Sequence, residues 1–311
     1  MHLQANLKAL RTAIPYIRAY KGRVFVVKLG GAVCEPGKLL DGIVDQLTLL
    51  YQLGIKLVVV HGGGQQASAL GQRLGHEPNL VAGRRITDDA TLETVKMALA
   101  GTVNTNLLAA FRKTDVPAVG LSGVDGRLLA ARKRPVQSVS DPATGQTREV
   151  DFGHVGDIVD VRADVLKHLL AGEYVPVICS LAADAGGRIY NVNADTVASR
   201  IAVALEAAKY FLVSSVDGVM RDPADPASLQ SYLDLEQLDE LLESGVISGG
   251  MLPKLAACRD ALCGGVPRVH IISGLVPDTL LGEVFTNEGC GTLIVAQRGA
   301  TNHGAPSAVK P

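Results

Sequence analysis

Short runs of apolar, β-branched residues alternate with longer stretches of helical periodicity along most of this chain. Such runs between turn signals are typical of buried strands, and their alternation with helices is typical of a parallel sheet with crossover helices. We therefore expect an α/β fold around a mainly parallel sheet. The expected strands are Val24–Leu29, Lys56–His61, Val116–Leu121, Val175–Ser180, Tyr210–Val216, His270–Ile272 and Thr292–Ala296. The expected helices are Leu39–Leu53, Gln65–Leu74, Asp88–Phe111, Ala163–Ala171, Ala194–Ala207, Leu235–Ser244, Pro253–Cys263 and Pro277–Phe285.

Three segments depart from this alternation. Residues 122–162 hold two short strand-like runs separated by the turn DPATGQ, which predicts an inserted β-hairpin flap and not a separate domain. The first 20 residues carry apolar positions at helical spacing before the first strand. This N-terminal helix packs either on its own domain or on a neighbouring subunit, and the periodicity leaves both open. Residues 298–311 are small and polar, so we expect a disordered tail.

Composition and charge exclude several classes of protein. The chain has 311 residues, 47% of them hydrophobic, which is enough for one large domain or two lobes. Its 30 Lys and Arg residues against 31 Asp and Glu residues give a net charge of −1, so the charge does not favour nucleic acid. No apolar run is long enough to span a membrane, and the start does not resemble a secretory signal. Five cysteines without CxxC spacing indicate reduced thiols and no metal site, so we expect a cytoplasmic protein.

Glycines follow several of the expected strands. Gly30 and Gly31 follow the first strand, Gly62–Gly64 follow the second, and Gly249 with Gly250 opens an expected helix. The carboxyl ends of parallel strands share one edge of a sheet, and ligands bind at that edge. Exposed amides and helix N-termini there suit an anionic group. The sequence therefore predicts a phosphate-binding site at this edge.

Two known nucleotide-binding loops bear on this site. The chain lacks the GxxxxGK[ST] loop of P-loop proteins. GGGQQA at residues 62–67 matches the GxGxxA dinucleotide fingerprint, but residues 81–85, where a ribose-binding acid belongs, contain two arginines. Arginines there suit NADP, so an NADP-dependent oxidoreductase stays an alternative, although we find no hydride-handling residue.

Charged residues lie beside these glycines. Lys28 precedes a glycine pair, and Lys254 lies at the start of a helix that another pair opens. Two cations beside exposed amides suit a phosphoryl group in transfer, because positioning and charge stabilisation catalyse that reaction. Asp195 either holds both lysines in place or, with Asn193 as the N-cap, only begins a helix. Arg85 offers a planar pair of donors to a substrate carboxylate.

Six ordered motifs carry a resemblance to a known family: VVKLGG, VVVHGGG, AGRRIT, GLSGVDG, NVNAD and SGGMLPK. In this order and spacing the chain resembles the amino acid kinase family, and within it the N-acetyl-L-glutamate kinases, over residues 16–296. The resemblance implies a three-layer αβα sandwich. An N-lobe (residues 21–180) would bind the acyl amino acid, and a C-lobe (residues 181–297) would bind ATP with Mg²⁺. The implied reaction phosphorylates the γ-carboxylate of N-acetyl-L-glutamate, a step of arginine biosynthesis.

The resemblance also implies roles for single residues. Lys28 and Lys254 would flank the transferred phosphoryl group, and Asp195 would organise them. A carboxylate nucleophile is already ionised at neutral pH, so the reaction needs no general base. The implied substrate-binding residues are Gly63, Gly64, Arg85 and Asn191, the phosphate-contacting ones are Gly30 and Gly31, and the ATP-binding ones are Ser215, Asp217, Gly250 and Met251.

The N-terminal AIPYI segment resembles the arginine-inhibited branch of the family. In that branch the first helix interlaces dimers, which moves our expectation toward a subunit contact in a homo-oligomer, either a dimer or a hexamer of dimers. The resemblance implies L-arginine as a feedback inhibitor, with Tyr16, Glu288 and Gly289 as contacts. Two alternatives stay open: a related kinase of lysine synthesis that acts on an aminoadipate derivative, and a non-catalytic arginine or nucleotide sensor, which would not need both lysines.

Overall fold

The computed structural model describes residues 2–76, 79–81, 84–140, 147–222, 224–245, 247, 249–286 and 289–297. Its centre is an eight-stranded sheet. In spatial order the strands of this large sheet are β16 (Tyr232–Asp234), β18 (Thr292–Val295), β17 (Val269–Ser273), β13 (Lys209–Ser214), β1 (Val24–Leu29), β2 (Lys56–His61), β10 (Val175–Cys179) and β5 (Ala118–Ser122).

The strand β1 lies in the middle of the large sheet, between β13 and β2. The strands from β17 to β5 pair in parallel, whereas β18 pairs antiparallel with β17 and carries β16 with it. The prediction of a mainly parallel sheet is confirmed, with two reversed strands at one edge. From β1 the chain continues to β2 on one side and later returns as β13 on the other. Open α/β sheets bind ligands at such a switch point.

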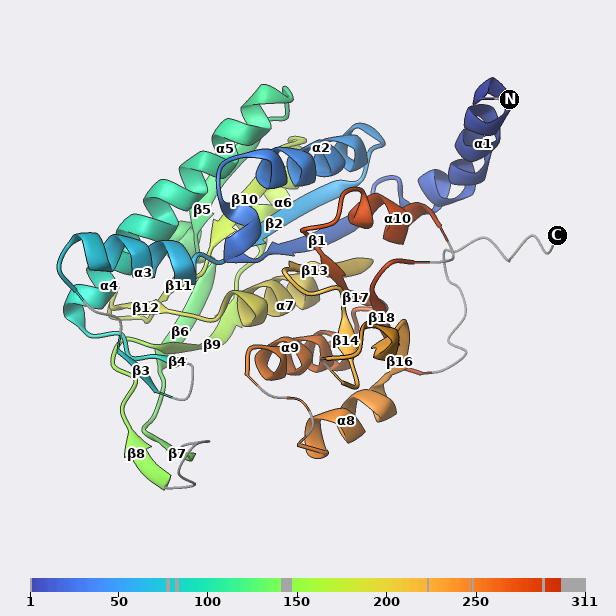
Figure 1. Ribbon diagram of the computed structural model, residues 1–311. Coiled ribbons are helices and arrows are strands. Elements are labelled where there is room, and N and C mark those ends of the chain that lie inside the picture. The colour runs from blue at the N-terminus through green and yellow to red at the C-terminus, as the bar shows by residue number, and fades with distance from the viewer. Residues whose placement is uncertain are drawn as a thin grey trace.

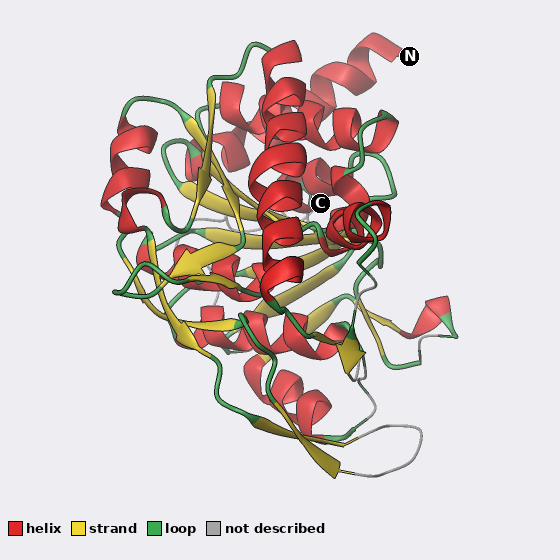
Figure 2. Cartoon of the chain, turned by 90° about the vertical axis from the view of Figure 1, so that its left-hand side faces the viewer, coloured by secondary structure: helices red, strands yellow, loops and turns green. Residues whose placement is uncertain are grey.

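Helices cover both faces of the large sheet, so the fold has the three layers that the resemblance implied (Figure 1 and Figure 2). The helices are α1 (His2–Tyr20), α2 (Lys38–Gln52), α3 (Gly64–Arg73), α4 (Asp89–Lys96), α5 (Asn104–Lys113), α6 (Asp164–Ala171), α7 (Ala194–Ala204), α8 (Leu235–Glu243), α9 (Met251–Cys263) and α10 (Thr279–Phe285).

Successive residues of β1 point to opposite faces of the sheet, as the period of a strand requires. Phe25 and Val27 join a buried cluster with residues of α2, α5 and α10. Val26 joins a second buried cluster with residues of α6, α7 and α9. Because β1 is apolar on both faces, it can lie only in the interior, with helices on each side. Lys28 near the end of β1, and Gly30 and Gly31 directly after it, therefore lie at the carboxyl edge of the sheet.

The predicted elements agree with the structure at most positions. β1 and β2 begin and end where expected, and the helix expected over residues 88–111 is one continuous helical segment. In this segment α4 runs through a π-helix, Met97–Val103, directly into α5. Strands of two or three residues escaped prediction, because runs so short show no alternation. Besides β16 these are β3 (Leu80–Val81), β4 (Arg84–Arg85), β11 (Leu181–Ala183), β12 (Ile189–Asn191), β14 (Val219–Met220) and β15 (Leu229–Gln230).

The insertion forms antiparallel strands, as predicted. β6 (Leu129–Lys133) pairs with β9 (Gly156–Val161), and β7 (Gln137–Ser140) pairs with β8 (Thr147–Val150). The β7–β8 hairpin projects from the body of the molecule (Figure 2). The base of the flap joins a small sheet in the order β12-β11-β6-β9. The flap is therefore tied to β12, which leads into the site described below.

Three further predictions concern the C-terminal tail, the division into lobes and membrane-spanning helices. The tail at residues 298–311 lies outside the described residues. The division into two lobes stays a prediction, although β1, β2, β10 and β5 come from the first part of the chain and β13, β17, β18 and β16 from the second. In the described part of the chain, no helix combines the length and the apolar character that a membrane span requires.

Candidate active site

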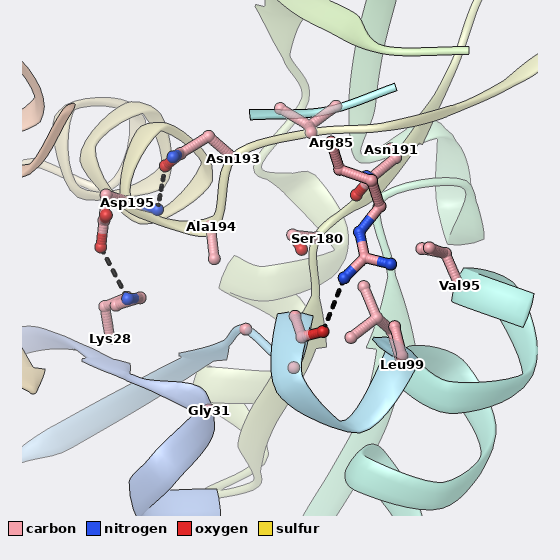
Figure 3. Close-up of a pocket in the computed structure, with 15 residues that line it drawn as sticks. Lys28, Gly31, Arg85, Val95, Leu99, Ser180, Asn191, Asn193, Ala194 and Asp195 are labelled. Atoms are coloured by element: carbon pink, nitrogen blue, oxygen red, sulfur yellow. Dashed lines mark hydrogen bonds and ion pairs between the residues drawn. The ribbon is translucent and has the colours of Figure 1, made fainter. Parts of the chain in front are cut away.

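A cavity of about 260 Å³ lies at the carboxyl ends of β1, β2 and β10, at the switch point of the sheet (Figure 3). Lys28 and Asp195 lie at one end of it and Arg85 at the other (Figure 3). The structure thus brings together residues that the motifs placed far apart in the sequence. The cavity is lined by Lys28, Gly31, Gly62, Gly63, Gly64, Ala67, Arg85, Val95, Leu99, Ser180, Asn191, Val192, Asn193, Ala194 and Asp195.

Asp195 pairs with both predicted lysines. Its Oδ1 lies 2.7 Å from Lys28 Nζ, and its Oδ2 lies 3.4 Å from Lys254 Nζ. Lys28 and Asp195 are almost completely buried, whereas Lys254 keeps about a fifth of its side chain exposed. A buried charge requires a partner, and one carboxylate here serves two ammonium groups. A net positive charge remains, as a site for a phosphoryl group requires.

The local sequence explains how Asp195 is placed. Asn193 is the N-cap of α7, and its Oδ1 accepts hydrogen bonds from the backbone N–H groups of Asp195 and Thr196, at 2.7 and 3.1 Å. Asp195 therefore does more than begin a helix, because the capped start of α7 also places its carboxylate beside the two lysines. The Tyr210 hydroxyl also donates a hydrogen bond to the backbone carbonyl of Asp195, at 3.0 Å.

The pKa values of this group follow from burial and charge. Burial by itself would raise the pKa of Asp195, but Lys28 and Lys254 offset it and hold that pKa below its usual value. Burial and the nearby Lys28 charge together lower the pKa of Lys254, and Asp195 opposes them. The carboxylate is thus ionised at neutral pH and lies between two cations.

The glycines at the strand ends allow close contact between backbones and side chains. A Cβ added at Gly63 would lie 2.4 Å from Leu99 Cδ2, and one at Gly31 would lie 3.0 Å from Gln66 Oε1. A side chain at Gly63 would therefore displace Leu99 from the cavity wall, and one at Gly31 would displace the end of the Gln66 side chain. Gly30 differs, because its N–H donates to the Val213 carbonyl at 2.9 Å. Its amide joins β1 to β13, which speaks against the phosphate contact expected of it.

Arg85 and Asn191 form the far wall of the cavity. Arg85 is half-buried, and its Nη2 donates to the Gly64 carbonyl at 2.8 Å and to the Ser68 hydroxyl. Burial lowers the pKa of Arg85, but from so high a value that the guanidinium remains charged. Asn191 ends β12, and its Nδ2 donates to Thr87 Oγ1 at 3.3 Å. Both side chains are tied in place with donor groups beside the cavity.

The other predicted residues lie outside this cavity. Ser215 and Asp217 are exposed after β13, on the opposite side of β1 from the glycine loop. Gly250 is the N-cap of α9 and Met251 its first residue. The ATP contacts expected of these four residues stay predictions. Of the arginine contacts, Tyr16 lies in α1 and Gly289 lies after α10, while Glu288 is outside the described residues.

Sequence reasoning missed part of the lining. Ser180 follows β10 directly at the same sheet edge, so the position at a strand end was a usable signal. Val95 and Leu99 form the apolar wall from within the long helical segment, where nothing in the local pattern separates a cavity residue from a core residue. In the part of the chain that the structure describes, no group of three or more His, Cys, Asp or Glu side chains could hold a metal ion.

Comparison with known proteins gives the class. Residues 23–273 match the amino acid kinase family, so the chain belongs to this family. Among its relatives, the acetylglutamate kinase of Myxococcus xanthus (strain DK1622) is 45% identical over 297 residues, covering 96% of this chain and 96% of that protein. The acetylglutamate kinase of Methanocaldococcus jannaschii is 41% identical over 285 residues, covering 92% and 94%. The family predicted from the six motifs is confirmed.

A solved structure with a similar fold is the N-acetylglutamate synthase of Neisseria gonorrhoeae in complex with coenzyme A and N-acetyl-glutamate. It has a TM-score of 0.79 and 29% identity, and the match covers 94% of this chain but only 64% of that longer chain. A complex of the same synthase with coenzyme A and L-arginine has a TM-score of 0.77 and 27% identity, covering 94% and 65%. The three-layer fold of the chain is thus shared with proteins that handle N-acetylated glutamate.

Proposed function

We propose that this chain transfers a phosphoryl group from ATP to the γ-carboxylate of N-acetyl-L-glutamate, a step of arginine biosynthesis. The observation that carries the proposal is the buried Asp195 with Lys28 at one end of the cavity, Lys254 paired with Asp195 next to it, and Arg85 at the other end. The two relatives described above are acetylglutamate kinases, and each matches almost the whole chain. The NADP-dependent alternative has no comparable support, because the glycine loop lines a cavity that ends at Lys28 and Asp195, and Asp195 pairs with a second lysine, Lys254.

The geometry supports a simple mechanism. Arg85, with Asn191 beside it, binds the α-carboxylate of the substrate, because a planar guanidinium matches a carboxylate with two parallel hydrogen bonds. The γ-carboxylate then lies at the other end, near Lys28 and the amides of Gly31, Gly63 and Gly64. It is ionised at neutral pH and attacks the γ-phosphorus of ATP directly, while the bond from this phosphorus to the bridging oxygen of the β-phosphate breaks and ADP leaves. Lys28 and Lys254 stabilise the negative charge on the transferring phosphoryl oxygens.

In this proposal, residues from the second part of the chain bind the nucleotide. We place ATP beyond Lys254, against the turn that holds Ser215 and Asp217 and the start of α9 at Gly250 and Met251. Helix N-termini offer free N–H groups and a positive dipole end, which suit phosphate oxygens. Mg²⁺ arrives with the nucleotide as MgATP, bound through the phosphate oxygens.

A hydroxamate assay tests the function, because hydroxylamine traps acyl phosphates. Purified protein with MgATP is offered N-acetyl-L-glutamate, an N-acylated 2-aminoadipate, or no acceptor. Product from N-acetyl-L-glutamate alone supports the proposal. Product from the aminoadipate derivative alone supports the related kinase of lysine synthesis. A folded protein that binds ATP and gives no product with either acceptor supports a non-catalytic sensor.

We expect Arg85→Lys to raise KM for N-acetyl-L-glutamate about tenfold or more while kcat changes little. A lysine keeps the charge but loses the planar pair of donors and the hydrogen bonds to Gly64 and Ser68. Steady-state kinetics with saturating MgATP provide the measurement. Arg259→Lys, an exposed arginine paired with Asp239, is the matched control. A KM equal to that of the wild type would remove Arg85 from the substrate site.

We also propose that L-arginine inhibits the enzyme at a site near α1 and α10. These helices pack against each other, and Tyr16 joins the core cluster that includes residues of α10. Gly289 lies against a carboxylate, since a Cβ added there would lie 3.1 Å from Glu283 Oε2. A carboxylate is the partner that a guanidinium ligand requires, and because the Glu283 oxygens already bond His270 Nδ1 and the Cys290 N–H, the ligand would share this carboxylate with them. The hydroxamate assay with added L-arginine tests this proposal, and undiminished activity at millimolar arginine would contradict it.

We further propose that α1 joins dimers into a larger homo-oligomer. Deleting residues 2–14 removes the outer part of this helix but keeps Tyr20, which packs on Phe25 with a centroid distance of 5.2 Å. We expect the full chain to form hexamers and the shortened chain to form dimers, as measured by light scattering coupled to size-exclusion chromatography. Identical masses for the two chains would refute the role of α1 in assembly.

A further inference from the structure

Two buried polar side chains below the glycine loop have no part in the mechanism above. His61 ends β2 with none of its surface exposed, and Asn104 begins α5 with 5% exposed. The Asn104 amide nitrogen Nδ2 lies 3.0 Å from His61 Nε2 and 3.0 Å from the Val177 carbonyl. On the other side of the imidazole ring, His61 Nδ1 lies 2.9 Å from the Gly62 carbonyl. These contacts form a chain of hydrogen bonds from Val177 of β10 to the glycine loop.

The carbonyl acceptors at the two ends of this row of hydrogen bonds determine which of the nitrogen atoms between them carry protons. The Val177 carbonyl can only accept, so the Asn104 atom that faces it is the NH₂ group. The same NH₂ group donates to His61 Nε2, which must then be the unprotonated ring nitrogen. The ring proton is therefore on Nδ1, where it is donated to the Gly62 carbonyl. Burial lowers the pKa of His61 to about 4, so the ring is neutral at physiological pH and has a single N–H to place.

The bond to the Gly62 carbonyl orients the next amide. The described residues contain no cis peptide bond, and in a trans peptide the C=O and the following N–H point in opposite directions. Since the Gly62 carbonyl points down to His61, the Gly63 N–H points away from it, toward the cavity that Gly62 and Gly63 line. Among the backbone hydrogen bonds of the described residues, the Gly63 N–H donates to none, whereas the Gly62 N–H donates to Leu29.

Two further features of the fold serve this arrangement. Gly120 of β5 makes room for Asn104, because a Cβ at Gly120 would lie 2.1 Å from Asn104 Oδ1. The π-helix Met97–Val103 widens the turn immediately before Asn104, and π-helical turns occur often at functional sites. In a regular α-helix, residues five apart point in different directions, whereas here Leu99 and Asn104 both contact the short segment from His61 to Gly63, Leu99 at Gly63 and Asn104 at His61.

We propose that His61 and Asn104 form a positioning pair that holds the Gly62–Gly63 peptide with the Gly63 N–H aimed into the cavity, at the reacting end of the acyl substrate. The inference rests on the proposed function and adds how the amide donor of that site is oriented. A donor set in advance at the position of developing charge needs no rearrangement during the reaction. Neither side chain lines the cavity, so both act through the peptide and not on the substrate.

The ring proton can be observed without any substrate. In protein labelled with ¹⁵N at histidine, a long-range ¹H–¹⁵N correlation spectrum distinguishes the two neutral tautomers, and the His61 signals are those that disappear in His61→Asn. We expect the Nδ1–H tautomer for His61. The Nε2–H tautomer, or a protonated ring at neutral pH, would overturn the proposal. This result does not depend on catalytic activity, so it remains decisive if the hydroxamate assay contradicts the proposed function.

Substitutions test the consequence for catalysis. His61→Leu removes the donor to Gly62, whereas His61→Asn places an amide N–H close to the position of Nδ1. We expect kcat to fall roughly tenfold to a hundredfold in His61→Leu, the scale of losing one well-placed donor or alignment. We expect His61→Asn to recover most of that loss, Asn104→Leu to behave like His61→Leu, and the Kd for MgATP to stay unchanged in all three. The matched control is His168→Leu at an exposed position of α6.

The outcomes separate positioning from general support of the fold. A purely structural pair would lower Tm equally in His61→Leu and His61→Asn, without selective recovery of kcat. A kcat in His61→Leu equal to that of the wild type would overturn the proposal. If the leucine variants do not fold, the tautomer of the wild type and the kcat of His61→Asn still decide it.

Discussion

Replacing Lys254 by alanine should lower kcat at least about a hundredfold, the scale seen when one preorganised charge stabiliser is removed. Lys254 Nζ lies 3.4 Å from Asp195 Oδ2 at the partly exposed side of the site, where the phosphoryl donor enters in our proposal. The fold should tolerate the change, because Asp195 keeps its shorter pair with Lys28 at 2.7 Å. The expected result is therefore a large loss of kcat with almost no change in Tm.

The measurement is kcat in the hydroxamate assay, with Tm recorded for each variant. Lys113→Ala is a matched control, because Lys113 is an exposed lysine that also pairs with an aspartate, Asp41, at 2.8 Å. Exposed pairs of this kind contribute little to stability. Neither Lys113 nor Asp41 lines the cavity. If Lys254→Ala kept the kcat of the wild type, Lys254 would have no role in phosphoryl transfer. If it lost stability as well as activity, its role would be structural.

Replacing Asp195 by alanine should affect stability as well as activity. The substitution leaves the buried Lys28 ammonium without its carboxylate, and breaking a buried ion pair costs about 3–5 kcal/mol. Activity should fall in addition, because neither lysine is then held in place. Urea denaturation measures the first effect, and the hydroxamate assay at low temperature measures the second. Asp41→Ala, which breaks the exposed pair with Lys113, is the control and should leave the denaturation midpoint unchanged.

The response to acid gives a second readout of the same pair. The pKa of Asp195 is lower in the folded protein than in the unfolded chain, so its ionised form stabilises the fold. That contribution is fully present above the pKa of Asp195 in the unfolded chain, about 3.9. It is lost as the pH falls through the lower pKa of Asp195 in the folded protein. Stability of the wild type should therefore fall more steeply below about pH 4 than that of Asp195→Asn. If the stability of the two proteins fell equally steeply with falling pH, the result would contradict a stabilising role of the buried ion pair.

The sequence predicted the fold class and part of the cavity lining because both depend on local pattern. Apolar runs of strand length, separated by helical periods, have few arrangements other than a parallel sheet between helices. In such a sheet the carboxyl ends of the strands share one edge, so the glycines at Gly31 and Gly63 and the lysine at Lys28 were bound to lie there. The capped start of α7 at Asn193 was equally local. Motif order then supplied the family, which the comparisons confirm.

Long-range packing determined the remaining features. The direction of β18, the apolar wall of Val95 and Leu99, and the chain of hydrogen bonds from Val177 to Gly62 all depend on which strands and helices become neighbours. Gly30 shows the limit most clearly, because its motif suggested a phosphate contact but its amide bonds the neighbouring β13. A local pattern states which residues are buried and which end a strand. Strand order and helix packing decide which buried groups contact each other. Those contacts determine the charge balance of this site and the orientation of its side chains.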